Sequence, residues 1–96
     1  MVNFNPNNMK IQLKGQLQTA AGMSNLEIEA SGDETLRDVI QSAAQKLPEA
    51  AKALITDESG DVRASLFIAV DGEHTRDLDQ PATANELILM PPMAGG

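Results

Sequence analysis

The sequence predicts an α+β domain in which a mixed sheet of four to five strands packs against one main helix and a short second helix. Two observations carry this prediction. Apolar residues alternate with polar ones near both ends of the chain, and between those regions they follow helical spacing. The length of 96 residues fits one domain with one modest core. That core must be mainly aliphatic, because Phe4 and Phe67 are the only aromatic residues of the types Phe, Tyr and Trp.

A hairpin is expected at the start of the domain, after a polar and flexible lead-in over residues 1–8. Its first strand covers residues 9–17, where apolar side chains alternate with polar ones and Gly15 loosens the pattern. Residues 20–25 make the turn. The second strand, residues 26–30, restores the alternation and completes the hairpin.

The helical region follows directly. Thr35 or Asp33 can cap free backbone amides at a helix start. Residues 36–47 then place their apolar side chains on one helical face, which predicts the main helix. Pro48 ends this helix or opens a short second helix that runs to Ile55.

The second half of the chain is expected to form a third strand, a short return strand and a last strand. They cover residues 62–70, 73–78 and 87–90, with a polar connection over 79–86. This order of elements is the ubiquitin-like β-grasp pattern, in which the third and last strands are neighbours and the helix covers one sheet face. The domain is expected to span residues 9–92, and residues 93–96 to form a flexible tail.

Composition excludes several function classes. The net charge of −7 argues against nucleic acid and is compatible with docking on a positive partner surface. No apolar run approaches the roughly 20 residues of a membrane helix, and no signal peptide begins the chain, so the cytoplasm is the expected compartment. Cysteine is absent and His74 is the single histidine, which predicts no thiol nucleophile and no metal site.

The last ten residues, LILMPPMAGG, resemble the C-terminus of the ThiS/MoaD family of sulfur carriers. In that family an apolar last strand leads through two prolines to a terminal Gly-Gly. The similarity extends to DGEHTRDLDQPATANEL before the last strand and to ETLRDVIQSAAQKLPEAAKAL in the helical region, and so spans roughly residues 9–96. The extra helical segment makes the chain more similar to the MoaD branch, the small subunit of molybdopterin synthase.

The resemblance implies that the reactive group is the C-terminal carboxylate of Gly96. A partner E1-like adenylyltransferase would join this carboxylate to AMP from ATP, and a sulfur donor protein would convert it to a thiocarboxylate. Gly95 and Gly96 suit this chemistry because a chain without Cβ atoms enters a narrow active site and bends there. The chain itself would bind no cofactor and supply no catalytic side chain, and it would donate sulfur within a complex with a larger synthase subunit.

The chain departs from the family pattern at several positions. Met93 and Ala94 replace a common Val and a small residue, residues 83–86 lack a turn glycine, and Leu17 stands near the usual place of an aromatic residue. These changes leave other sulfur pathways open, namely those for cysteine, siderophores or tRNA thiolation. A ubiquitin-like modifier joined to lysines is a further reading. A third is a β-grasp binding module whose tail is idle.

A partner-binding surface is expected beside the tail. Phe67 lies out of phase with the inward residues of its strand, so it should meet Ile88 or Met90 on the open sheet face. The alternative is that residues 1–8, with Phe4, cover Phe67. Pro91 and Pro92 stiffen the base of the arm, which continues through Met93 and Ala94 into the partner's site.

Other polar residues are expected to be ordinary surface groups. His74 would be a solvated loop histidine next to a turn. The cations Arg37, Lys52, Arg63 and Arg76 would be solvated surface charges. Residues 57–61 have some calcium-loop character but are too few for an EF-hand, and a solvated turn is expected.

Overall fold

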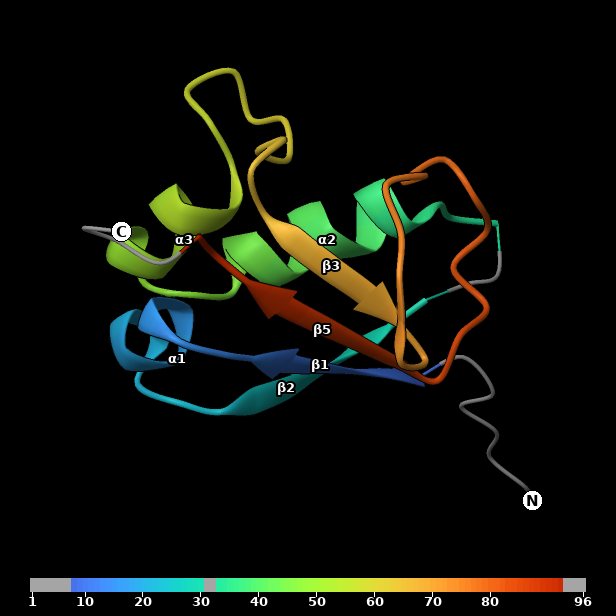
Figure 1. Cartoon of the computed structure of the whole chain (residues 1–96), viewed down its shortest axis with the longest axis horizontal. Helices are drawn as coiled ribbons and strands as arrows, with labels where there is room; N and C mark the ends of the chain where they lie inside the picture. The colour runs from blue at the N-terminus through green and yellow to red at the C-terminus, as the bar shows by residue number, and fades with distance from the viewer. Residues whose placement is uncertain (1–7, 31–32, 93–96) are drawn as a thin grey trace.

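A five-stranded mixed sheet forms the centre of the structure, a computed structural model that describes residues 8–30 and 33–92. Its strands are β1 (Asn8–Leu13), β2 (Asn25–Glu29), β3 (Phe67–Val70), β4 (Glu73–His74) and β5 (Glu86–Met90). They lie in the order β2-β1-β5-β3-β4, and β1 and β5 run parallel while the other pairs are antiparallel (Figure 1). The β-grasp prediction is confirmed, including the pairing of the third and last strands.

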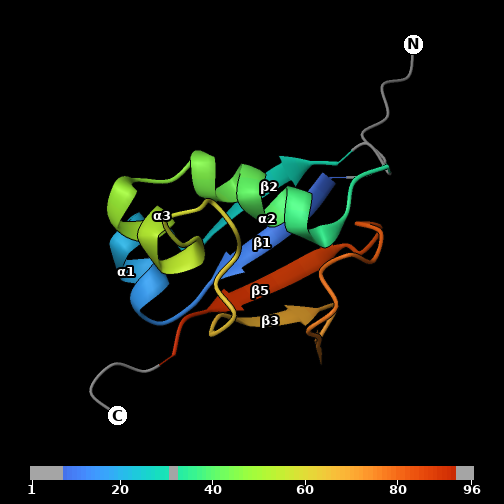
Figure 2. The same ribbon diagram turned by 90° about the horizontal axis from the view of Figure 1, so that it is seen from above.

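Three helices accompany the sheet: α1 (Gln16–Ala21), α2 (Leu36–Gln45) and α3 (Glu49–Ile55). Helix α2 begins with a capping box, because the Asp38 backbone N–H donates to Thr35 Oγ1 at 3.2 Å and the Thr35 N–H donates to Asp38 Oδ2 at 3.1 Å. Of the two predicted capping residues, Thr35 performs this role. Figure 2 shows α2 and α3 on one side of the sheet.

The core lies between α2 and the face of the sheet that it covers. The central strands β1 and β5 supply fully buried aliphatic side chains, and α2 supplies an aliphatic stripe. These residues are Met9, Ile11, Leu13, Leu87 and Leu89 from the strands, and Leu36, Val39, Ile40 and Ala43 from the helix. Because the pleat alternates sides, the next residue along each strand faces away from α2.

The predicted first strand was too long, because residues 16–21 form helix α1. Gly15, at φ +60°, turns the chain out of β1, and Gly22, at φ +73°, ends the helix in a left-handed conformation. Leu17 and Ala21 are four residues apart and both buried, as one helical face requires. Leu17 also fits the strand alternation, so its inward position did not distinguish the two structures.

The predicted third strand was also too long. Residues 63–66 form a turn in which the Leu66 N–H donates to the Arg63 carbonyl at 3.1 Å, and Val62 makes only an isolated bridge with Thr56. Val62 and Leu66 are nevertheless buried, so the turn reproduces the inward alternation of a strand. The return strand shortens to β4, and the last strand begins one residue earlier, at Glu86.

Candidate functional site

Strand β5 presents different residues to the two sides of the sheet. Leu87 and Leu89 are fully buried toward α2, whereas Ile88 is half-buried and Met90 is 37% exposed on the opposite, open face. The carbonyl of Leu89 accepts a hydrogen bond from the Lys14 N–H at 3.0 Å, just before α1. The C-terminal end of β5 therefore lies next to α1 (Figure 1).

The predicted partner-binding residues of the two strands do come together. In the antiparallel pair β3–β5, Phe67 lies opposite Met90, and Ala69 lies opposite Ile88. Phe67 is 37% exposed, like Met90. Side chains directly opposite one another on one sheet face lie in contact range, so the register forms one apolar surface next to the end of β5.

His74 belongs to this surface, which the sequence did not predict. It lies in β4 opposite Ala69, so it shares the face of Phe67. The two rings are stacked, with centroids 4.7 Å apart and planes 6° from parallel. His74 is exposed, as predicted, but it lies in a strand and not in a loop, and its ring is stacked on a partner. We call Phe67, His74, Ile88 and Met90 the open-face patch.

The rest of the open face is polar. Gln12 donates a hydrogen bond to the Glu86 carboxylate across the parallel pair β1–β5, directly beside the patch. Beyond it, Lys10 lies opposite Glu27 in the β1–β2 ladder, and Glu29 lies at the end of β2. The open face thus has an apolar half over β3 and β5 and a polar half, with several carboxylates, over β1 and β2.

The arm that follows β5 is described only at its base. Pro91 is buried and Pro92 is exposed. Burial gives Pro91 an anchoring position at the strand end and leaves Pro92 as the first solvent-facing residue of the arm. The predicted tail residues Met93, Ala94, Gly95 and Gly96 lie outside the described residues, as does Phe4, so the reading in which residues 1–8 cover Phe67 is untested.

Two of the remaining candidates, Arg37 and the turn at residues 57–61, have structural partners. Arg37 on α2 forms ion pairs with Asp61 at 2.8 Å and with Asp79 at 3.4 Å, and the hydrogen bond to Asp61 is the main cause that raises its pKa above the ordinary value. Residues 57–61 form an exposed turn, as predicted, held by the Asp57 carboxylate, which accepts from the Ser59 N–H and hydroxyl. Arg37 therefore joins this turn to α2.

Among residues 8–30 and 33–92, no group of three His, Asp or Glu side chains is placed to hold a metal ion. In the same part of the chain, no helix has the length and apolar character needed to cross a bilayer. The open-face patch is an exposed apolar surface beside the base of the arm, and such a surface suits docking of another protein.

Comparisons with known proteins identify relatives of the whole chain. The ThiS family model matches residues 11–96. SAMP1 from Haloferax volcanii has a similar structure, with a TM-score of 0.81 and 26% identity over 93% of this chain and 99% of that one. Small archaeal modifier protein 1 from Methanosarcina acetivorans gives a TM-score of 0.72 and 27% identity over 93% of this chain and 96% of that one.

A third similar structure is a putative molybdopterin converting factor, subunit 1, from Pyrococcus furiosus. Its TM-score is 0.69 at 21% identity, over 90% of this chain and 98% of that one, which shows a shared fold. No curated protein matches the chain. Because the family model covers all of the described sheet from Ile11 onward and continues to Gly96, the chain belongs to the ThiS family and has its ubiquitin-like β-grasp fold.

Proposed function

We propose that this protein is a sulfur carrier whose reactive group is the C-terminal carboxylate of Gly96. The observation that carries the proposal is the arrangement around β5. This strand places an exposed apolar patch directly beside the base of an arm that ends in Gly95 and Gly96. The match of the ThiS family model through residue 96 supports the same reading.

The arm is long enough to extend well away from the domain. The chain from Pro91 to Gly96 extends at most about 20 Å, at roughly 3.3–3.6 Å per residue. Burial of Pro91 fixes the start of the arm on the domain. Pro92 restricts the next backbone torsion, and the two glycines leave the reacting carbonyl without neighbouring Cβ atoms. A fixed base and an unhindered tip deliver the carboxylate into another protein's active site.

The chemistry requires two partners. An E1-like adenylyltransferase joins the Gly96 carboxylate oxygen to the α-phosphorus of ATP and releases pyrophosphate. Hydrosulfide supplied by a donor protein then attacks the activated carbonyl carbon. The new C–S bond replaces the C–O bond to AMP, AMP leaves, and a thiocarboxylate remains. ATP is bound by the adenylyltransferase, and this chain holds no cofactor of its own. The cytoplasm is the expected compartment.

The open-face patch is the proposed docking surface for the adenylyltransferase. Phe67 and Met90 are exposed apolar side chains in cross-strand register, and such side chains gain free energy when a partner covers them. The chain has a net charge of −7, which favours a partner surface that is positive around its apolar centre. Pro92, Met93 and Ala94 would follow the patch into the partner's channel.

For the sulfur acceptor, we propose molybdopterin synthesis, with this chain as the small subunit of a heteromeric synthase. Its basis is the similarity of the C-terminus and the helical region to the MoaD branch. The sulfur carriers of cysteine, siderophore and tRNA thiolation pathways share the same kind of tail and remain the alternatives.

A second candidate function is a ubiquitin-like modifier, in which the activated Gly96 is joined to lysines of other proteins. A specific observation favours it: two structures that match at 26% and 27% identity are those of small archaeal modifier proteins. Adenylation of Gly96 is common to both functions. They differ in whether sulfur or a lysine amine attacks the adenylate.

Intact mass spectrometry tests the proposal. The full chain is incubated with an E1-like adenylyltransferase, ATP and a sulfur donor from cells competent for sulfur transfer. The expected product has the mass change of one oxygen replaced by sulfur, and fragmentation assigns it to Gly96. Gly96 found only on lysines, with no thiocarboxylate, would favour the modifier.

Deletion of Gly96 provides the control. The deleted residue lies beyond β5, so the described domain should unfold at the same denaturant concentration while adenylation is lost. If the shortened chain keeps its cellular function, the tail is idle and the binding-module reading is correct.

A further inference from the structure

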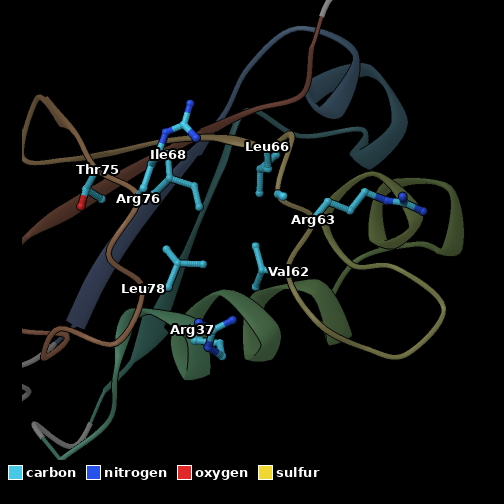
Figure 3. Close-up of a pocket in the computed structure, with 9 residues that line it drawn as sticks. Arg37, Val62, Arg63, Leu66, Ile68, Thr75, Arg76 and Leu78 are labelled. Atoms are coloured by element: carbon cyan, nitrogen blue, oxygen red, sulfur yellow. The ribbon is translucent and has the colours of Figure 1, made fainter.

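A pocket of about 300 Å³ lies on the α2 side of β3, away from the open-face patch. Figure 3 shows Val62, Leu66, Ile68 and Leu78 facing one another around it. Ile68 belongs to β3 and faces α2, while its neighbour Phe67 faces the open side. The walls come from the turn before β3 and from the connection after β4. The pocket therefore has an aliphatic lining and opens at the side of the molecule.

All three arginines of the chain line this pocket, and none of the four lysines does. The side chains of Arg37 and Arg76 lie on opposite sides of the aliphatic lining in Figure 3, whereas Arg63 extends toward α3. The Nε of Arg63 donates to the Ala53 carbonyl at 2.8 Å, which holds that side chain against α3. The three arginines thus border the pocket on different sides, in a chain whose net charge is −7.

The three guanidinium groups differ in how far they are already neutralised. Arg37 is paired with Asp61 and Asp79. Arg63 keeps its terminal nitrogens available but is directed along α3. Across the described residues, 8–30 and 33–92, Arg76 forms no hydrogen bond and no ion pair, and it is exposed. Arg76 is thus the cation at the pocket that still lacks an anionic partner within this part of the chain.

We propose that this pocket is a second docking site, which binds a short acidic and aliphatic peptide segment of a partner protein. One aliphatic side chain of the segment fills the space between Val62, Ile68 and Leu78. A neighbouring carboxylate forms a charge-assisted pair with Arg76. The volume is at the lower end of small-molecule sites, which run from about 300 to 1,000 Å³ and enclose most of their ligand. An open pocket of this size suits one side chain of a larger partner.

This site is independent of the proposed tail chemistry. The pocket and the open-face patch lie on opposite faces of β3, because Ile68 and Phe67 point in opposite directions. A partner in the pocket would leave Phe67, Met90 and the arm accessible. The protein could then be held by one partner while another acts on its C-terminus.

Nuclear magnetic resonance titration of the full, ¹⁵N-labelled chain tests the inference. The probe is the capped peptide Asp-Glu-Leu-Ile-Asp-Glu, and the matched probe is Asn-Gln-Leu-Ile-Asn-Gln. We expect saturable shifts of the amides of Ile68, Thr75 and Arg76 with the acidic peptide. The neutral peptide should bind about tenfold more weakly, because it lacks the charge-assisted pair.

Variants of exposed cations complete the test. Arg76→Gln should weaken binding of the acidic peptide by about tenfold, and Arg76→Lys should restore part of it. Lys46→Gln removes the same charge from an exposed position outside the pocket and should change the affinity by about twofold or less. The proposal is overturned if no saturable shifts occur at the pocket, if the two peptides bind equally, or if inorganic phosphate alone gives the same saturable shifts. The last outcome would make it a small-anion site.

Discussion

Leu89 and Met90 are adjacent on β5 and both have large apolar side chains, but the two side chains lie in different environments. Leu89 is fully buried under α2, and Met90 is 37% exposed opposite Phe67. The inner face has a helix over it, whereas no helix of the described residues covers the open face (Figure 2). One strand therefore serves two purposes: its inner residues stabilise the fold, and its outer residues remain available for a partner.

The contrast between the two faces shows where a small domain can place function. A chain of 96 residues has one modest core, and the inner face supplies it. An active-site cavity cut into that core would remove much of the apolar burial on which stability depends. In the proposed function the reactive group instead lies beyond the sheet, and the open face would guide it to a partner.

The largest expected effect comes from truncation of the inner face. Leu89→Ala should lower the free energy of unfolding by about 2–5 kcal/mol, because it removes buried methyl groups and leaves a cavity between β5 and α2. Met90→Ala, on the next residue of the same strand, should lower it by about 1 kcal/mol or less, since Met90 is partly solvated. Denaturant unfolding of both variants measures the difference. Equal losses would contradict the assignment of the two faces.

The second prediction concerns Gly15, which follows β1 and lies close to Met90. Gly15 joins β1 to α1 at φ +60° and ψ −137°, a conformation that residues with a Cβ rarely adopt. An added Cβ would lie 3.8 Å from the Cγ of Met90, which is ordinary contact, so the cost is in the backbone. Gly15→Ala should lower the free energy of unfolding by about 1–3 kcal/mol.

The matched control for this change is Gln18→Ala, an exposed position within α1 where alanine fits the helix. That variant should unfold close to the parent chain. If Gly15→Ala is as stable as Gln18→Ala, the turn out of β1 does not need glycine, and the boundary between strand and helix is set by other contacts.

The third prediction concerns the open face itself. Phe67→Ala should leave the fold nearly as stable but reduce kcat/KM for adenylation of Gly96 by about tenfold, mainly through KM, because it removes a central apolar contact. Phe67→Leu keeps part of that contact and should fall between. Glu27→Gln, on the polar half of the same face, is the control. An unchanged KM in Phe67→Ala would show that the partner does not dock on the open-face patch.

The comparison also explains what the sequence could predict. The apolar alternation on β1 identified its inner residues, and the phase of the third strand placed Phe67 on the open face. The order of the elements predicted the β-grasp fold. Strand β5 is a continuous apolar run in sequence, so its outward neighbour of Phe67 was left as either Ile88 or Met90. The first and third strands were predicted too long because inward residues in a short helix or a turn repeat at the spacing of a strand, as Leu17, Val62 and Leu66 do. Burial alone does not distinguish these structures.

Two features of the sites could not be predicted from the sequence, for a different reason. The stack of His74 on Phe67 depends on the register of β3 and β4, which brings together residues seven positions apart through a turn. The gathering of Arg37, Arg63 and Arg76 depends on three separate elements that meet only in the folded chain. The sequence predicts a turn next to His74, but the presence of a turn does not set this register.

A region that belongs to neither face gives the smallest predicted effect. In the exposed turn at residues 57–61, hydrogen bonds from Ser59 lower the pKa of Asp57 below its ordinary value. The hydrogen bond from the Ser59 hydroxyl has the largest effect. A lowered pKa in the folded state means that this group stabilises the fold above the ordinary carboxyl pKa of about 4, and that the contribution is lost as the pH falls through the lower folded value.

Denaturant midpoints measured at neutral and strongly acidic pH test this prediction in the parent chain and in Asp57→Asn. The parent should lose slightly more stability over this step than the variant, because only the parent has the titrating carboxylate.

The turn is tied to α2 by Arg37 and Asp61, at 2.8 Å, and by the Gln41 side chain, which donates to the Gly60 carbonyl at 2.9 Å. Protonation of Asp57 should therefore loosen the turn locally and leave the open-face patch unchanged. A shift in the amide signals of Phe67 or Met90 over the same pH step, absent from Asp57→Asn, would show that the turn and the open face are coupled.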